Sequence, residues 1–331
     1  MAVQTVCGLV SAEELGVVCP HEHLVCDLTA LYGPRADPHA AASGASEDLR
    51  AGDLRLDDPV LAAEELRRYR AAGGGTIVDV TLRDIGRDPL ALRALSEATG
   101  VHVVMGAGWY VAASHPADMP ARDVDELAAE LVRELRVGAD GTGIRAGIIG
   151  EIGTSPQPTA QERKVVRAAA RAQLETGAAI TLHACSATRH AIELLELIGS
   201  EGVTDLGRVI VGHQDCVLDH DYHREVLRAG ALVELDLFGH AYYASEGFQL
   251  PTDAERVDMV VALCEKGFAD RLLLSHDICM RAQWHCRGGV GYAHLSTEIE
   301  PLLRARGLDD DAIDRLRRHN PARVLDLAPS P

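Results

Sequence analysis

The 331-residue sequence is poor in lysine and in aromatic residues, and it has no long apolar run. Lysine occurs only at Lys164 and Lys266, and 32 Lys and Arg stand against 50 Asp and Glu, a formal net charge of −18. A chain this acidic repels phosphate backbones and anionic lipids, so we expect neither nucleic acid nor a membrane as its partner. No run of about 18 apolar residues is present to form a transmembrane helix.

Paired cysteines and common nucleotide or nucleophile motifs are also missing. The eight cysteines are dispersed, none lies in a Cys-x-x-Cys pair, and the N-terminal segment lacks the basic and apolar regions of a signal peptide. These features predict a cytoplasmic protein with free thiols. The sequence has no P-loop, no Gly-x-Ser-x-Gly elbow and no complete Gly-x-Gly-x-x-Gly turn.

What the sequence does contain is a regular alternation of two patterns. Eight short runs rich in Val, Ile and Leu are typical of strands buried on both faces, at residues 17–19, 76–80, 101–105, 146–149, 178–182, 209–211, 231–235 and 272–274. Helical patterns lie between them, at residues 58–72, 123–137, 159–176, 187–200, 253–266 and 297–306. This order predicts an α/β fold, a (β/α)8 TIM barrel formed by residues 1–331 as a single domain. A doubly wound parallel sheet is the alternative.

Side chains that can bind metals follow five of the eight predicted strands: His21, His23, Glu151, His183, His213 and Asp277. Because the carboxyl ends of barrel strands meet at one mouth, we expect these side chains to lie close together. Any one of the histidines could instead be a hydrogen-bonding core residue, so the argument depends on the whole set. Six ligands are too many for one catalytic zinc and suit two ions that share a carboxylate.

The spacing of the ligands suggests how the two ions divide them. His21 and His23 are two residues apart on a strand, so their side chains point the same way. We place these two histidines with Asp277 on one ion, His183 and His213 on the other, and Glu151 between the ions. His276 directly precedes Asp277, so we expect its side chain to point away from the metals.

Several ordered motifs resemble the phosphotriesterase-related family of the amidohydrolase superfamily. They are GVVCPHEHL (16–24), GIIGEIGTS (147–155), ITLHACS (180–186), RVIVGHQD (208–215), LLLSHDI (272–278) and NPARVL (320–325). The resemblance implies a barrel with two divalent ions, zinc first and manganese, cobalt or iron as alternatives, and a metal-bridging hydroxide as nucleophile. Many members carry a carboxylated lysine where this chain has Glu151. The sequence therefore resembles the Glu-bridged phosphotriesterase homology proteins, and we do not expect efficient phosphotriester hydrolysis.

The resemblance implies a metal-dependent hydrolase that acts on a small ester, lactone or amide. Asp277 would take the proton of the nucleophile, and Tyr110 matches a tyrosine beside the lactonase metal centre. Trp109, Phe238 and Trp284 would line the substrate pocket with Tyr110. The alternatives are a phosphoester hydrolase, a metal-assisted lyase or isomerase, and a non-catalytic barrel that binds a small molecule. A homodimer is left open.

Substrate selectivity is expected in the loops 33–53, 238–252 and 279–295. Family members often have a basic residue after the seventh strand, where this chain has Asp236. We expect Asp236 to be a carboxylate that hydrogen-bonds behind the ligands.

Overall fold

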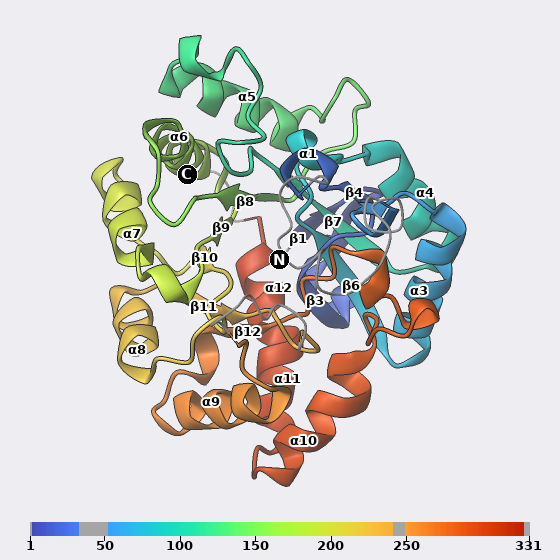
Figure 1. The fold of residues 1–331 in the computed structure, drawn as a ribbon. Coiled ribbons are helices and arrows are strands. Elements are labelled where there is room, and N and C mark those ends of the chain that lie inside the picture. Colours follow the sequence, from blue (N-terminus) through green and yellow to red (C-terminus); the bar gives the residue numbers. More distant parts are fainter. Residues whose placement is uncertain (1, 33–51, 241–248, 328–331) are drawn as a thin grey trace.

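The computed structural model describes residues 2–32, 52–240 and 249–327. Its centre is a sheet of eight strands in the order β12, β11, β10, β9, β8, β7, β6, β3, with parallel pairing and with helices on the outside (Figure 1). The strands are β3 (Val17–Glu22), β6 (Gly74–Asp79), β7 (His102–Ala107), β8 (Ile148–Gly153), β9 (Ile180–His183), β10 (Val209–Val211), β11 (Leu232–Leu235) and β12 (Leu272–Leu274). Each overlaps one of the predicted runs, so the predicted (β/α)8 barrel is confirmed.

The outer helices follow the strands in sequence. They are α3 (Pro59–Ala71), α4 (Pro89–Thr99), α5 (Val124–Arg136), α6 (Ala160–Thr176), α7 (Ala191–Ser200), α8 (His220–Ala229), α9 (Asp253–Glu265) and α10 (Glu300–Ala305). The sequence patterns missed α4 and α8. The signal for α4 was present, because Asp88 caps it by accepting the amides of Leu90 and Ala91 and is followed by Pro89. Among the described residues no helix is long and apolar enough to cross a membrane, and all eight cysteines are free.

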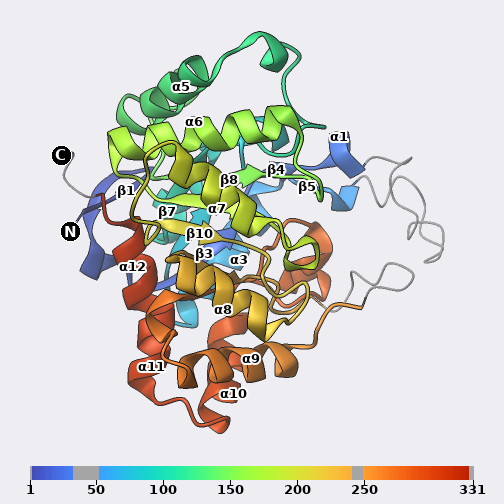
Figure 2. The same cartoon turned by 90° about the vertical axis from the view of Figure 1, so that its left-hand side faces the viewer.

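Smaller elements cover the two ends of the barrel. They are the hairpin β1 (Ala2–Thr5) and β2 (Gly8–Ser11), the pair β4 (Cys26–Asp27) and β5 (Arg55–Leu56), and the helices α1 (Thr29–Tyr32), α11 (Asp310–Asp314) and α12 (Asn320–Leu325). Figure 2 shows β1 and α12 at one end and α1, β4 and β5 at the other. The amide of Leu327 donates to the carbonyl of Ala2 at 2.9 Å, which ties the two ends of the chain together.

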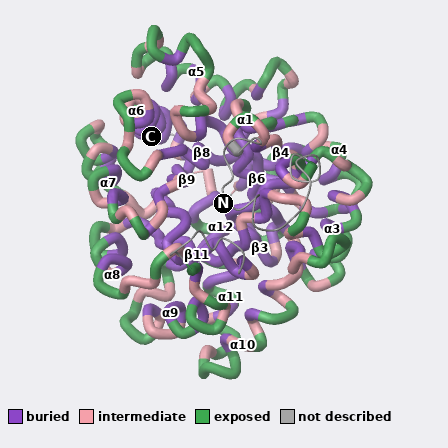
Figure 3. Tube along the Cα trace, viewed as in Figure 1, coloured by how far each residue is buried: buried purple, intermediate pink, exposed green. Residues whose placement is uncertain are grey.

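The barrel interior is packed with aliphatic side chains from all around the sheet. This inner layer includes Val18, Val78, Val104, Ile148, Ala179, Ile210, Leu232 and Leu273, all buried. Val3, Leu15 and Val324 extend the same cluster and close the floor of the barrel. Figure 3 shows the buried trace in the middle of the molecule and the exposed trace on the outer helices. Because the floor is filled, polar chemistry is confined to the carboxyl ends of the strands.

Two strands change register just before their polar residues. The pairing of β3 with β6 shifts between Cys19 and Glu22, and the pairing of β8 with β9 shifts between Ile149 and Ile152. Strict alternation from the interior residues Val18 and Ile148 would turn His21 and Glu151 outward. The irregularities reverse this, as β-bulges do, and bring His21 and Glu151 to 3.3 Å from one another.

The first and the last strand join through the segments that carry the polar residues. The amide of Asp277 donates to the carbonyl of His21 at 3.1 Å, and the amide of His23 donates to the carbonyl of Ile278 at 3.2 Å. We call these two hydrogen bonds the closing seam. The seam closes the barrel and fixes the spacing of three predicted ligands at the same time.

Close backbone contact at Gly75 on β6 gives a test of the packing. A Cβ atom at this position would lie 2.1 Å from the carbonyl oxygen of Leu15. We therefore expect Gly75→Ala to lower the free energy of unfolding by about 1–3 kcal/mol, through overpacking against rigid backbone. Chemical denaturation measures this change.

The matched control is Gly199→Ala in α7, where an added Cβ meets no atom within 4 Å. Helix propensity predicts that this variant gains about 0.5–1 kcal/mol. Equal stability of the two variants would contradict the packing described for Gly75.

Candidate metal centre

The six predicted ligands converge at the carboxyl end of the barrel. Their donor atoms form two groups, His21, His23 and Asp277 in one and Glu151, His183 and His213 in the other. Within each group the atoms lie within 4.8 Å of one another. The structure thus brings the six side chains together, and His21 and His213 also form a group with Asp236. The division of the ligands between two ions stays a prediction.

Glu151 lies at the centre of the cluster and faces both groups. Its Oε2 atom is 2.9 Å from Nδ1 of His183, and 3.3 Å from Nε2 of both His21 and His213. Its Oε1 atom is 3.4 Å from Nε2 of His23, which in turn lies 3.2 Å from Oδ1 of Asp277. One carboxylate with its two oxygens turned toward different histidines has the geometry needed to bridge two ions.

The hydrogen bonds among the donor atoms leave some of these atoms unsatisfied, and divalent cations would satisfy them. Nε2 of His21 is buried, and although it lies 3.3 Å from Oε2 of Glu151, it forms no hydrogen bond in the described part of the chain. Nδ1 of His183 lies only 2.6 Å from Nε2 of His213, both beside the Glu151 carboxylate. Buried polar atoms without partners are costly, and mixed imidazole and carboxylate donors suit zinc and its neighbours in the first transition row. These residues therefore fit a pair of divalent cations.

Polar groups below the mouth hold the other ring nitrogen of three of the histidines. Nδ1 of His213 lies 3.0 Å from Asp236, and Nδ1 of His21 lies 3.0 Å from Glu234 and 3.3 Å from Asp236. Nδ1 of His23 lies 2.8 Å from Oγ1 of Thr81. Such contacts orient the rings and turn the Nε2 atoms toward the cluster.

Asp236 also accepts the backbone amide of His213 at 2.9 and 3.0 Å. This contact supports His213 in a left-handed conformation (φ 53°) that is uncommon outside glycine. The expected hydrogen-bonding role of Asp236 is thus present. The sequence reasoning missed Glu234 and Thr81. The sequence does contain a signal for Glu234. It lies two positions before Asp236 in an otherwise apolar run, so the two carboxylates are expected on the same side of the strand.

The carboxylates and histidines shift one another's ionisation. Burial raises the pKa of Glu151, but the neighbouring His21 and His183 outweigh burial and hold it well below its ordinary value. Burial raises the pKa of Glu234 to about 7 although His21 opposes the rise. Burial and the adjacent His213 lower the pKa of His183, which favours the neutral imidazole that binds metals.

Tyr110 lies beside the cluster as the sequence suggested. Its hydroxyl oxygen is 3.3 Å from Nδ1 and 3.4 Å from Nε2 of His183, and its backbone amide donates to Asp84 at 2.9 Å. Trp109 is almost fully buried and packs under the guanidinium of Arg122, 5.3 Å from the ring centroid. Tyr110 is therefore placed to act on a group bound next to His183.

The other two predicted pocket aromatics, Phe238 and Trp284, are fully buried. The indole nitrogen of Trp284 donates to the hydroxyl of Tyr292, which donates to the carbonyl of His23 at 2.6 Å. In this conformation Trp284 supports the strand that carries a ligand rather than forming an open pocket wall. Of the loops expected to set selectivity, residues 33–51 and 241–248 lie outside the described residues.

Comparisons with known proteins identify the relatives of this chain. The profile of the Phosphotriesterase family matches residues 1–325. N-acetyltaurine hydrolases from Danio rerio and Homo sapiens are 35% and 34% identical over 340 residues, covering 98% of this chain and 97% of each relative.

Solved structures give the same result. A resiniferatoxin-binding protein from Rhodobacter sphaeroides has a TM-score of 0.93 and 38% identity, covering 98% of this chain and 95% of the other. A phosphotriesterase homology protein from Escherichia coli, complexed with phosphate in its active site, has a TM-score of 0.83 and 34% identity over 95% and 99% of the two chains. A lactonase from Listeria monocytogenes has a TM-score of 0.86 and 27% identity over 99% and 100%.

The dual contact of Asp236 predicts an effect on metal binding. Asp236→Asn preserves shape but turns an amide group toward ring nitrogens that need an acceptor. We expect its affinity for divalent ions to fall by about 10–100-fold, as measured by competition with a chromogenic chelator. Asp125→Asn changes a carboxylate that is 83% exposed on α5 and serves as the control. Equal affinities in the two variants would contradict the role given to Asp236.

Proposed function

This chain belongs to the phosphotriesterase family of hydrolases, and we propose that it uses two divalent cations to hydrolyse a small carboxylic amide. Esters and lactones are proposed as related substrates. The observation that carries the proposal is the position of Glu151, whose two oxygens face the two groups of donor atoms.

We propose that one cation is held by His21, His23 and Asp277 and the other by His183 and His213, with Glu151 on both. When bound, such a pair polarises a carbonyl oxygen and lowers the pKa of water to near neutrality. Zinc is the first candidate, and manganese, cobalt or iron are alternatives because the same donors accept them.

The chain's own residues would then handle protons and charge. Asp277 lies at the mouth with 16% of its side chain exposed, where it can accept a proton from the attacking water. It would deliver this proton to the departing amine nitrogen, which an amide needs because an unprotonated amine is a poor leaving group. Tyr110 beside His183 would donate a hydrogen bond to the oxygen that becomes negative. Water and amide thus give a carboxylic acid and an amine.

The choice of an amide comes from the relatives. Proteins named for the hydrolysis of N-acetyltaurine share 34–35% of their residues with this chain along nearly its whole length. An N-acetylated small amine, with N-acetyltaurine itself as the first compound, is therefore the substrate class to test. The net charge of −18 disfavours anionic substrates at long range, so an uncharged N-acetyl amide of similar length belongs in the same test.

Three other functions have specific support. The lactonase from Listeria monocytogenes favours lactone hydrolysis, and the phosphate in the Escherichia coli protein is compatible with a phosphoester. The similarity to the resiniferatoxin-binding protein favours a barrel that binds a small molecule without turnover. Cytoplasmic localisation and a single domain stay predictions from the sequence, and a homodimer is left open.

Metal content tests the proposed centre. We expect protein purified without chelator to hold about two divalent ions per chain by elemental analysis. Glu151→Ala should lose the pair, because it removes the carboxylate whose oxygens lie close to His183 in one donor group and to His23 in the other. Glu97→Ala on the exposed side of α4 should retain both ions. A full pair in the Glu151→Ala variant would remove this residue as the bridge.

Product analysis tests the reaction. In ¹⁸O-labelled water we expect one labelled oxygen in the carboxylic acid released from an N-acetyl amide. Asp277→Ala should lower kcat by at least about 100-fold, the range for loss of a proton-transfer group. Turnover without label would favour a lyase or isomerase, and binding without turnover across amides, lactones and phosphoesters would favour the binding barrel.

A further inference from the structure

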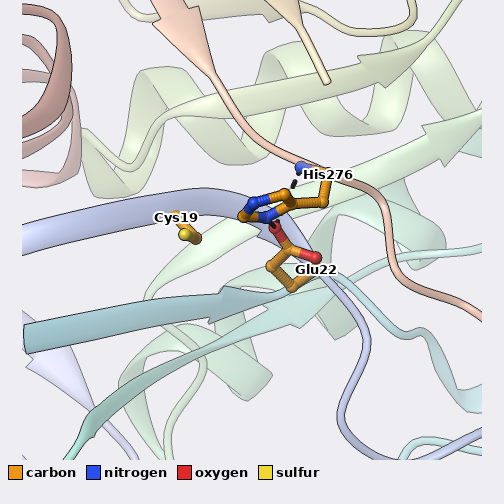
Figure 4. Close-up of side chains that lie close together, drawn as sticks. All are labelled: Cys19, Glu22 and His276. Atoms are coloured by element: carbon orange, nitrogen blue, oxygen red, sulfur yellow. Dashed lines mark hydrogen bonds and ion pairs between the residues drawn. The ribbon is translucent and has the colours of Figure 1, made fainter. Parts of the chain in front are cut away.

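Glu22 stands between the ligands His21 and His23 but faces the other way. Its side chain is fully buried, and alternation along the strand turns it away from the metal cluster. Figure 4 shows the Glu22 carboxylate and the His276 ring pointing toward one another, with Cys19 nearby. None of these three residues is a ligand in the centre described above.

The Glu22 carboxylate binds the segment of chain that carries Asp277. Oε1 accepts the Ser275 hydroxyl at 2.7 Å, the His276 amide at 3.0 Å and the His276 ring nitrogen Nδ1 at 2.6 Å. Oε2 accepts the amide of Ile278 at 3.0 Å. The donors come from the residues on both sides of Asp277, so one side chain holds the backbone around this ligand. We call these hydrogen bonds the Glu22 contacts.

The cluster of Cys19, Glu22 and His276 is a poor metal site although its atoms lie close together. The amide of Leu295 donates to Nε2 of His276 at 3.1 Å, so the ring proton sits on Nδ1 and is shared with Glu22. Both ring nitrogens are thus used. The guanidinium of Arg317 approaches Sγ of Cys19 to 4.0 Å, and this buried positive charge would repel a cation. The cluster is therefore structural.

The backbone conformation of Asp277 explains why the Glu22 contacts are needed. Asp277 has φ 52°, a left-handed conformation that is strained in residues other than glycine and persists only where the surrounding structure holds it. The closing seam ties Asp277 to His21 on one side. Glu22 adds hydrogen bonds to the amides of His276 and Ile278, one before and one after the strained residue.

We infer that Glu22 is a positioning residue that fixes Asp277 against His21 and His23, so that three donors of one cation site are assembled before the cation arrives. Glu22 lies directly between the two histidines in the chain, so its contacts with residues 275–278 set the distance between the end of β3 and the end of β12. The Glu22 contacts are a property of the folded chain. Their effect on the affinity for a cation rests on the proposed function.

Glu22→Gln tests the inference, because the amide keeps the shape but presents N–H groups to N–H donors. In metal-free protein we expect the amides of residues 275–278 to exchange at least tenfold faster by hydrogen–deuterium exchange. In a metal titration followed with a competing chelator, one of two ions should bind about 10–100-fold more weakly while the other keeps its affinity. Zn²⁺ is the probe ion.

The matched control is Glu134→Gln, which also removes a buried carboxylate charge. Glu134 accepts two hydrogen bonds from Arg87, and it belongs to α5 on the outside of the barrel. This variant should lose stability but keep normal exchange at residues 275–278 and normal affinity for both ions. If Glu22→Gln fails to fold, Glu22→Asp shortens the side chain by one methylene group, which withdraws the carboxylate from the amides of His276 and Ile278, and it should give the same changes at severalfold size.

The outcomes separate the inference from the proposed function. Exchange and ion affinities equal to those of Glu134→Gln would overturn the inference, as would faster exchange with both affinities unchanged. A wild-type protein that binds no ions contradicts the proposed function instead. In that case unchanged hydrogen–deuterium exchange at residues 275–278 of Glu22→Gln would still contradict the role of the Glu22 contacts, and faster exchange would support it.

Discussion

The closing seam between the first and the last strand is the interaction on which the rest of the site depends. Its two hydrogen bonds join His21 to Asp277 and His23 to Ile278, so the bonds that close the barrel also set the spacing of three donor atoms. The backbone of these three residues cannot shift without breaking the bonds that close the barrel. The site is therefore as rigid as the fold, which is what preorganised metal chemistry requires.

Below the seam the barrel changes from an apolar to a charged interior over a short distance. The aliphatic layer that contains Leu232 and Leu273 is followed by Glu234 on β11 and by Asp236 just after this strand. Both carboxylates contact histidine rings from below the mouth. Burying this many ionisable groups is unfavourable unless opposite charge compensates them. Partial compensation comes from the histidines, and two cations at the mouth would supply the remainder.

Much of this arrangement could be read from the sequence, because strands buried on both faces leave continuous apolar runs and a barrel gathers their carboxyl ends. His183 and Asp277 could be placed by that rule alone. The register shifts in β3 and β8 could not be predicted from the sequence, because they depend on pairing with neighbouring strands. Glu22 was hidden for the same reason, because its role arises from a segment more than 250 positions away.

The aromatic residues show a second limit. Trp284 follows the last strand in the sequence, a position that suggested a pocket wall, yet tertiary packing buries its ring behind His23. Loop residues are placed by contacts that no local pattern encodes, whereas strand-end ligands are placed by the architecture.

Anomalous diffraction from crystals of the protein, recorded at the absorption edge of the bound metal, tests the central claim most directly. We expect two peaks, one beside His21, His23 and Asp277 and one beside His183 and His213, with Glu151 between them. A single peak, or a peak at Cys19 and His276, would contradict it.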